Sequence, residues 1–508
     1  MLDSRPNSRL GISGRLGPTF ACGVCHYCCG SLSFEDHLNA PRGLGALHDW
    51  PHSGAVGGAA CGDLLRVSVR ADGDRIAEAG FDAEGCGAAR AAGSAVVELV
   101  EGSLFLDAAR ITPDHISDAL GGLIPPKRHA ATLAADALHR ALGSAARAGT
   151  VRLAPSARRT LAAMSGGVDS AAAAQLALDA GDDVLAVTLE LWSDPATDGE
   201  RSCCSPQAVT GARALAHRMG VPHVTLDVRE RFRSAVVSSF LDGYAEGRTP
   251  NPCVKCNGEV RFDAMLDLAR ALGAARLATG HYARIARDEH GPLIRAGADP
   301  LKDQSYMLAR LDPGLLDRLS FPLGGLTKDA VRQLARDSGL PVADKRESQD
   351  LCFVAGLGGR AFLRRHGGPR LRRPGVIVDR EGRVLGRHEG QHEFTVGQRR
   401  GLNVSSTDPL YVLSKDADTG TVTVGPREAL ATTRVRLERT TLHRPADSVQ
   451  AVRLRYHARA LPCRVRQTAP GTLELELQEA ALAVAPGQLG ALMHDDCVVG
   501  EGTIGEPA

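Results

Sequence analysis

Three cysteines in two distant segments have residue types and spacing suited to sulfur or metal chemistry. Cys253 and Cys256 lie in RTPNPCVKCNGEVRF, residues 248–262, and Cys352 lies in SQDLCFV. Thiolates are nucleophiles, metal ligands and carriers of transferable sulfur. The chain has 13 cysteines, and its first residues, MLDSRPNSRLGISGR, lack the apolar core of a secretory signal. We therefore expect a cytoplasmic protein whose cysteines serve metal, cluster or redox chemistry rather than a disulfide framework.

The composition is that of a globular protein with several cores. The chain has 508 residues, 43% of them hydrophobic and 23% charged, so about three domains are expected. It has no apolar run of about 18 residues, which predicts no membrane association. Its net charge is only +1, so any nucleic acid must bind to a local basic patch. The segment GRAFLRRHGGPRLRRPG, residues 359–375, is such a patch, and its glycines and prolines favour a loop.

A glycine-rich turn, Ser165-Gly-Gly-Val-Asp-Ser170, falls between an expected strand (RRTLAAM) and an expected helix (DSAAAAQLALDAG). The unpaired amides and the positive dipole end of a helix start bind phosphate. Glycines let the backbone approach the anion, and the hydroxyls of Ser165 and Ser170 add donors. The chain contains no Gly-Lys dipeptide, which excludes a Walker-type phosphate loop. The turn therefore predicts a nucleotide site that uses ATP in a different way.

The expected secondary structure divides the chain into regions. Strand-like LLRVSVRA and RIAEAGFDA, followed by helical CGAARAAGSAVVELVEG and HAATLAADALHRAL, predict a compact α+β unit over about 31–145. A stretch rich in Ala, Gly and Ser then predicts a linker that tethers this unit. Strands alternate with helices to about residue 360, which predicts a doubly wound parallel sheet. Short alternating runs beyond residue 374 predict β-rich closure in small barrels.

The motif SGGVDS resembles the PP-loop of the ATP pyrophosphatases, which cut between the α- and β-phosphates and leave an adenylated substrate. Over roughly residues 160–505 the chain is similar to the tRNA-specific 2-thiouridylases, the MnmA family. The similarity is carried, in order, by AMSGGVDS, VTLELW, GRTPNPCVKCN, ATGHYAR, KDQSYML, SQDLCFV, HEGQHEFTVGQRRGL, LRYHARA and APGQLG. The resemblance implies that ATP, with Mg²⁺, adenylates O2 of the wobble uridine of a tRNA and that sulfur then replaces AMP.

The same resemblance assigns residues to ligands. It implies ATP contacts for Ala163, Met164, Ser165, Gly166, Gly167, Val168, Asp169, Ser170, Leu189 and Gly280. It implies tRNA contacts for Asn251, Pro252, Cys253, His281, Lys302, Asp303, Gln304, Arg455, Tyr456 and Gln488. Phosphates of the tRNA are expected on the arginine patch, which consists of Arg360, Arg364, Arg365, Arg370, Arg372 and Arg373, and on Arg399 and Arg400. Asp169 is expected to shape the turn and the helix start rather than to carry a proton.

The family pattern makes Cys256 and Cys352 the catalytic pair that carries and releases sulfur. Members commonly have aspartate three residues before the first cysteine, whereas this chain has Cys253 there. Three thiolates suit three irons of a 4Fe-4S cluster whose fourth iron stays open to sulfide, which is the interpretation we favour. Two alternatives stay open: a persulfide or disulfide route through Cys256 and Cys352 alone, and a zinc site, for which the sequence shows no fourth ligand.

The first domain resembles the IscU/NifU-like iron–sulfur scaffolds in EDHLNAPRGLG, AACGD, AEGCGAARA and IPPKRHAATLAADAL. This resemblance implies iron–sulfur or zinc ligands at Cys61, Asp63, Cys86 and His129, while the third cysteine of the family is replaced by Ala130. A preceding run, CGVCHYCCG, has metal-ligand spacing at Cys22, Cys25, Cys28 and Cys29. A scaffold domain that donates a cluster and an enzyme that uses one would fit together functionally in a single chain.

The sequence thus predicts a fused tRNA 2-thiouridylase that acts as a monomer and receives sulfur from a cysteine desulfurase or another donor. The expected order is a cysteine-rich extension (1–30), a scaffold domain (31–145), a linker (146–160), a PP-loop catalytic domain (161–365), a central tRNA-binding domain (366–428) and a C-terminal β-barrel (429–508). Two rival functions are a non-catalytic iron–sulfur carrier that docks on tRNA and a PP-loop amidotransferase or synthetase for a small molecule. The intact glycine turn disfavours the first rival, and the arginine patch disfavours the second.

Overall fold

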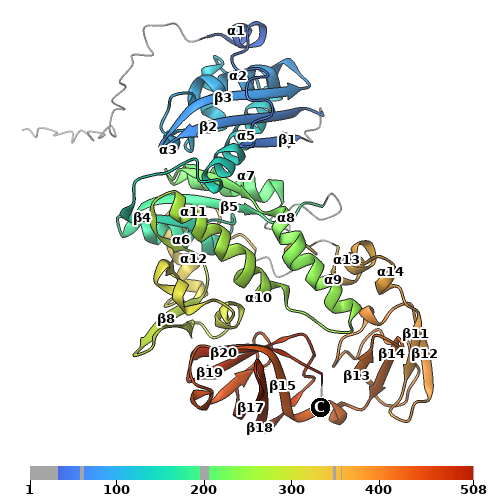
Figure 1. Ribbon diagram of the computed structural model, residues 1–508. Helices are drawn as coiled ribbons and strands as arrows, with labels where there is room; N and C mark the ends of the chain where they lie inside the picture. Colours follow the sequence, from blue (N-terminus) through green and yellow to red (C-terminus); the bar gives the residue numbers. More distant parts are fainter. Residues whose placement is uncertain (1–31, 58–61, 195–204, 347–350, 356, 507–508) are drawn as a thin grey trace, which may run out of the picture.

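The computed structural model describes residues 32–57, 62–194, 205–346, 351–355 and 357–506. Figure 1 shows an α+β domain at the top, a parallel sheet with its helices in the middle, and two β-rich parts side by side at the bottom. These parts follow one another in the order predicted from the sequence, so the expected fold class is confirmed. No helix within these ranges is long and apolar enough to cross a bilayer.

The first domain is a three-stranded antiparallel meander, β1-β2-β3, covered by helices. Leu65, Val67 and Val69 recur at every second position of one strand and are all buried, which gives this sheet its core face. The core is completed by the apolar faces of two long helices that pack on the sheet. The elements are α1 (Phe34–Asn39), β1 (Ser53–Gly57), β2 (Leu64–Asp72), β3 (Arg75–Glu84), α2 (Gly87–Val100), α3 (Phe105–Ala108), α4 (Pro113–Ala119) and α5 (Arg128–Arg147).

The second domain is a doubly wound α/β fold with the parallel strand order β10-β7-β4-β5-β6. The chain leaves the central strand β4 toward β5 and β6 and later returns to its other side for β7. The carboxyl end of β4 is therefore the switch point at which such sheets bind ligands. The elements are β4 (Ser156–Ala163), α6 (Val168–Asp179), β5 (Asp183–Glu190), α7 (Pro206–Arg218), β6 (His223–Asp227), α8 (Arg229–Phe232), η2 (Arg233–Val237), α9 (Ser238–Ala245), α10 (Pro252–Cys256), α11 (Phe262–Ala271), β7 (Ala274–Ala278), β10 (Leu319–Ser320) and α12 (Lys328–Asp337).

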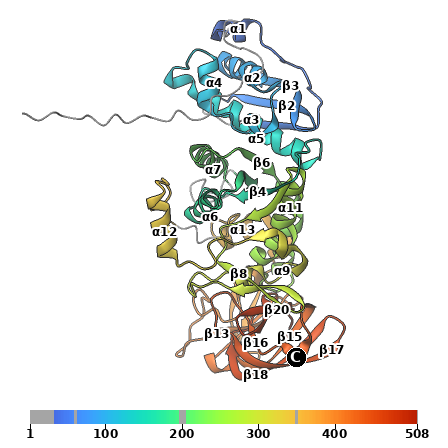
Figure 2. The same cartoon turned by 90° about the vertical axis from the view of Figure 1, so that its left-hand side faces the viewer.

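Helix α5 docks the first domain on the second, as Figures 1 and 2 show from two sides. Its C-terminal half packs against β6, the edge strand of the parallel sheet. A Cβ atom at Gly143 would overlap the carbonyl oxygen of Thr225, so glycine permits this close approach. The backbone amide of His223 also donates across the junction to the carbonyl of Ala109, at 2.8 Å. The helix thereby covers a sheet edge that would otherwise be unpaired.

Buried polar groups complete this junction. Asp136 of α5 pairs with Arg213 of α7, and Arg140 pairs with Glu190 at 2.6 Å. Between α5 and β4 the chain is held by a bridge from Val151 to Gly73. The predicted linker, 146–160, includes the end of α5 and the start of β4, so the connecting segment between these two elements is short.

The β-rich region forms two sheets. One has the order β12-β11-β14-β13, and the other contains a six-stranded barrel, β15-β18-β17-β16-β19-β20, closed by pairing of β15 with β20. The hairpin β8–β9 comes from the second domain but joins the barrel's sheet through β20. The elements are β8 (Ala283–Asp288), β9 (Gly291–Ala296), β11 (Gly375–Val378), β12 (Val384–His388), β13 (Tyr411–Asp416), β14 (Thr421–Gly425), β15 (Ala431–Leu442), β16 (Ala451–Arg453), β17 (Leu461–Ala469), β18 (Thr472–Leu482), β19 (Leu489–His494) and β20 (Cys497–Ile504).

Arg360, Arg364, Arg365 and Arg370 of the arginine patch lie on two short helices, α13 (Gly359–His366) and α14 (Gly368–Leu371), so the predicted loop is wrong for this part. Arg372 and Arg373 follow the second helix. Phe362 and Leu363 are buried in the core of the second domain, and this packing stabilises the first helix. Pro369 stands in the first turn of the second helix, where a missing amide proton costs nothing. Tertiary packing thus overrides the local glycine and proline signals.

Candidate active site and metal centre

The glycine turn is built between β4 and α6 as the sequence predicts. Gly167 is the N-cap of α6, and Gly166 takes a φ of +72°, a left-handed conformation that favours glycine. The hydroxyl of Ser170 accepts from the amide of Ser165 (3.1 Å) and donates to the carbonyl of Gly167 (3.0 Å). These bonds fix the turn at the switch point, where the amides that start α6 can bind phosphate.

Other residues predicted to hold ATP lie along the same edge of the sheet. Gly280 follows β7, and a Cβ atom there would lie 2.7 Å from the carbonyl carbon of Asp169 and 2.8 Å from the amide nitrogen of Ser170. Any side chain at this position would push the helix start out of place. Leu189 is buried near the carboxyl end of β5, directly beside β4. The strand order therefore brings three distant segments to one place.

Two lysines reach this turn from far along the chain, and sequence reasoning missed both. Lys328 Nζ donates to both carboxylate oxygens of Asp169, at 2.7 and 2.8 Å, and the Tyr282 hydroxyl donates to the same carboxylate at 2.7 Å. Lys345 Nζ donates to the carbonyl of Gly166 at 2.9 Å. Asp169 lies in the first turn of α6, so these bonds anchor the helix start as predicted for that residue. No local motif marks either lysine, because each acts only through tertiary contact.

Cys253 and Cys256 lie on α10, and their spacing places both on one face of the helix. Asn251 caps this helix: its side-chain oxygen accepts from the amides of Cys253 and Val254, at 3.2 and 3.3 Å. Pro252 is the first helical residue, as suits its fixed φ. Cys256 is 5% exposed and belongs to the main core of the catalytic domain.

The segment with Cys352 packs against the same part of the fold as α10. Phe353 is buried, and its ring centroid lies 5.6 Å from that of Phe232 and 5.3 Å from that of Phe240. Those two phenylalanines flank η2, which α10 contacts. Both cysteine-bearing segments therefore lie against the stretch 232–240, although they are far apart in sequence.

The state of the sulfurs bears on the three interpretations. Within the described ranges no disulfide joins Cys256 to Cys352. Among those same residues the sulfurs of Cys253, Cys256 and Cys352 do not form a compact single-ion site. Cys22, Cys25, Cys28, Cys29 and Cys61 lie outside the described residues.

Some residues predicted to touch tRNA are held by internal hydrogen bonds. Asp303 accepts from the amides of Gly297 (2.9 Å) and Ser305 (3.0 Å) and pairs with Arg453. The side-chain oxygen of Gln304 accepts from the amide of Tyr282 at 3.0 Å. Lys302 lies in the same loop. These bonds show how the loop is shaped, and contact with tRNA stays a prediction.

A second group of predicted tRNA residues lies where the barrel meets the catalytic domain. Gln488 donates to the carbonyl of Thr249 at 2.6 Å, and Arg455 donates to the carbonyls of Leu482 and Ala483 at 3.2 and 3.0 Å. The Tyr456 ring stacks 6.3 Å from that of Tyr306, whose helical turn contacts α10. The barrel is thus fastened to the segment that leads into the cysteine helix.

His281 is enclosed by aromatic rings. Its ring lies 5.6 Å from that of Phe262 and 6.1 Å from that of Phe321, and Nδ1 lies 2.7 Å from the hydroxyl oxygen of Thr279. Burial lowers the pKa of His281 to about 3, so the ring is neutral near pH 7. A neutral ring can stack on a base or share a hydrogen bond, but it cannot neutralise a phosphate.

The scaffold domain brings together three of its four predicted ligands. Oxygen, sulfur and nitrogen atoms of Asp63, Cys86 and His129 all lie within 4.8 Å of one another. The Cys86 thiol donates to Asp63 at 3.1 Å, and His129 Nε2 lies 3.2 Å from the same carboxylate. Gly85 has a φ of +128°, and a Cβ there would strike this carboxylate. Ala130, in place of the third cysteine, is fully buried in the core.

Comparison with known protein families matches four consecutive models to the chain. They are a NifU-like N terminal domain (residues 33–148), a tRNA methyl transferase HUP domain (158–356), a tRNA methyl transferase PRC-barrel domain (360–426) and an aminomethyltransferase beta-barrel domain (432–504). The matched ranges follow the domains seen in Figure 1.

Curated relatives match either the whole chain or its last three domains. The bifunctional protein NifU/MnmA of Rubrobacter xylanophilus is 44% identical over 482 residues, which cover 92% of this chain and 97% of that protein. The tRNA-specific 2-thiouridylase MnmA of Thermobifida fusca is 46% identical over 68% of this chain and 96% of its own length. That of Rhodospirillum centenum is 44% identical over 69% of this chain and 92% of its own length.

Proposed function

The chain belongs to the family of bifunctional NifU/MnmA proteins and is a tRNA-specific 2-thiouridylase, and from this premise we propose how its residues divide the reaction. The glycine turn binds ATP with Mg²⁺. The uridine O2 atom attacks the α-phosphorus, an O–P bond forms, and pyrophosphate leaves with the electrons of the broken α–β bond. Sulfide, or the outer sulfur of a persulfide on one cysteine, then adds to C2 of the base, the C2–O2 bond breaks, and AMP leaves. On the persulfide route the second cysteine then attacks the sulfur of the first, which releases the 2-thiouridine and leaves a disulfide that an external thiol reduces.

The observation that supports this division most strongly is the built nucleotide turn. Its amides start α6, Gly280 leaves room against it, and Lys328 fixes Asp169 in the first helical turn. Such a turn stabilises the charge that moves onto pyrophosphate without a reorganisation of the backbone. A non-catalytic iron–sulfur carrier that only docked on tRNA would not need a turn whose backbone amides are arranged to bind phosphate.

Cys256 and Cys352 are the proposed sulfur-handling pair. Cys256 is buried beside the aromatic cluster that also holds Phe353, so water has little access to a reactive sulfur there. Cys253 stands on the same helix face and completes a set of three thiols, the donor type that iron–sulfur clusters select. These three would hold a 4Fe-4S cluster, which would supply an open iron for sulfide. The persulfide route is the competing outcome of the experiment below.

The scaffold domain is proposed to hold iron, an iron–sulfur cluster or zinc at Asp63, Cys86 and His129. Mixed oxygen, sulfur and nitrogen donors within a few ångströms of one another fit such a group. A cysteine desulfurase or another donor would deliver sulfur to the chain.

The function is tested with the full chain, unmodified tRNA, ATP and Mg²⁺ under anaerobic conditions, once with sulfide and once with cysteine and a cysteine desulfurase, which supply persulfide sulfur. Formation of 2-thiouridine, measured by nucleoside mass spectrometry, is expected together with AMP and pyrophosphate. Cys256→Ser is expected to abolish 2-thiouridine formation, while Cys463→Ser, in the barrel, should leave it intact. Product formation by Cys256→Ser at the wild-type rate would contradict the assignment.

A further inference from the structure

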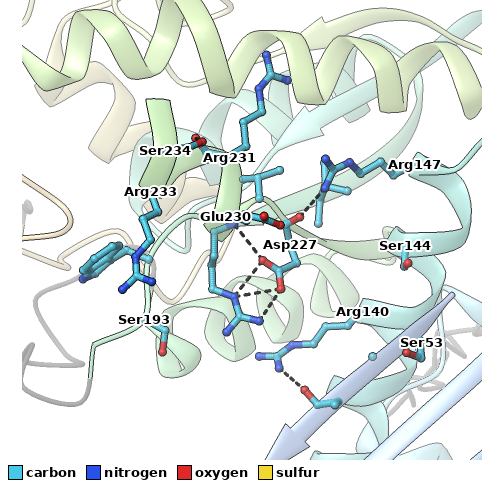
Figure 3. Close-up of a pocket in the computed structure, with 16 residues that line it drawn as sticks. Ser53, Arg140, Ser144, Arg147, Ser193, Asp227, Glu230, Arg231, Arg233 and Ser234 are labelled. Atoms are coloured by element: carbon cyan, nitrogen blue, oxygen red, sulfur yellow. Dashed lines mark hydrogen bonds and ion pairs between the residues drawn. The ribbon is translucent and has the colours of Figure 1, made fainter. Parts of the chain in front are cut away.

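A solvent-open cleft of about 1070 Å³ lies between the scaffold domain and the catalytic domain. Figure 3 shows its walls: β1 and α5 on one side, the ends of β5 and β6 and the start of α8 on the other. Five arginines line it, from both domains: Arg140, Arg147, Arg229, Arg231 and Arg233. Hydroxyl groups of Ser53, Ser144, Ser193 and Ser234 line it as well. The cleft exists only because the two domains are docked.

Two of these arginines keep their charge uncompensated by any carboxylate of the described residues. Arg147 donates only to the backbone carbonyl of Asp227, at 3.0 Å. Arg233 is exposed, and its guanidinium lies 5.7 Å from the centre of the Trp192 ring without an ion pair. The other three pair with acids, Arg229 with Asp227 being one example. Two acids, Asp227 and Glu230, also line the cleft, so its five arginines leave the lining with a surplus of positive charge supplied by both domains.

The cleft is continuous with the arginine patch. Asp194, next to the cleft residue Ser193, pairs with Arg365 at 3.1 Å and with His366 at 2.8 Å, both on α13. Trp192 also packs its ring 6.4 Å from that of Phe353, the neighbour of Cys352. These contacts place the cleft next to the cysteine region and next to α13. Figure 1 places β1, α8 and α13 on the same side of the molecule.

We infer that this cleft binds the phosphodiester backbone of the tRNA substrate, so that the scaffold domain is itself part of the tRNA interface. The inference rests on the proposed function and adds a binding surface to it. A polyanion suits the geometry, because the guanidinium groups are spread along the open cleft instead of converging on one point as a site for a single small anion requires.

The experiment measures the affinity of the full chain for unmodified tRNA at several KCl concentrations. Arg147→Ala and Arg233→Ala test one wall each, and Arg233→Lys keeps the charge of its wall. Matched controls are Arg90→Ala, exposed on α2, and Arg287→Ala, exposed on β8. Each cleft variant is expected to weaken binding about fivefold and to lower the salt slope by about one. Arg233→Lys should recover most of the affinity, and the controls should bind like wild type.

Wild-type affinity and salt slope in both cleft variants would overturn the inference. So would unchanged tRNA binding with lost binding of a purified cysteine desulfurase, since the cleft would then serve an acidic protein surface. If the wild-type chain binds tRNA and makes 2-thiouridine, and the cleft variants bind tRNA with the same affinity, the inference about the cleft is refuted and the proposed function stands. A wild-type chain that neither binds nor thiolates tRNA refutes the proposed function.

Discussion

Replacement of Gly280 by alanine tests whether the glycine turn and the strand end at 280 form one nucleotide site. The new Cβ atom would lie 2.7, 2.8 and 2.9 Å from the Asp169 carbonyl carbon, the Ser170 nitrogen and the Asp169 carbonyl oxygen. These are backbone atoms of the helix start, so the strain cannot be relieved by a side-chain rotation. Overpacking of this kind costs about 1–3 kcal/mol. If the turn moves to relieve it, ATP binding weakens by about five- to 150-fold.

The measurement is calorimetric titration of the full chain with a non-hydrolysable ATP analogue, alongside AMP formation with tRNA. Gly325→Ala is the matched control, because a Cβ atom there meets nothing within 4 Å. A Gly280→Ala variant that folds normally and binds the analogue as tightly as wild type would refute the reasoning. It would show that the start of α6 and residue 280 do not constrain the bound nucleotide.

Three further predictions concern buried charges. Lys328→Ala leaves the carboxylate of Asp169 without its cation, and kcat/KM for ATP is expected to fall about ten- to a hundredfold, with Lys328→Arg partly active. Arg140→Ala leaves the buried Glu190 unpaired and should lower the free energy of unfolding by about 3 kcal/mol in urea titrations, while a further Glu190→Gln change restores most of it. Burial lowers the pKa of His217 from 6.5 to about 4, so the unfolded chain binds the extra proton between these values and stability falls as the pH drops through that window. His217→Gln should flatten the pH dependence of the unfolding free energy, by up to about 3 kcal/mol across the window.

Local patterns predicted the elements whose structure depends on neighbours in sequence. The glycine turn at 165–170 was predictable because strand end, glycines and helix start are consecutive. The helices over 87–100 and 128–147 show their apolar periodicity directly. Family motifs predicted that Cys256 and Cys352 share one site, and this stays a prediction. Phe353 packs on Phe232, which borders the η2 segment that α10 contacts.

Features that depend on tertiary contacts could not be predicted from the sequence. Lys328 and Asp169 are 159 residues apart, and no periodicity joins them. The role of Gly143 depends on the backbone of β6, which the sequence does not place beside α5. The helix at 359–366 forms because Phe362 is buried by the aromatic cluster, against the local signal of its glycines. The composite cleft likewise depends on how two domains meet.

The most direct test of the proposed sulfur chemistry compares two variants of the full chain, Cys86→Ala and Cys86→Ala with Cys253→Ala, both purified without oxygen. The Cys86→Ala change removes a proposed iron ligand of the scaffold domain from both variants. Bound iron and the yield of 2-thiouridine are measured on the same samples. The cluster account predicts that Cys253→Ala loses the iron held by the catalytic domain and the thiolation activity together. With cysteine and a cysteine desulfurase as the sulfur source, full thiolation by a variant that holds no iron would contradict it and favour a persulfide on Cys256 or Cys352.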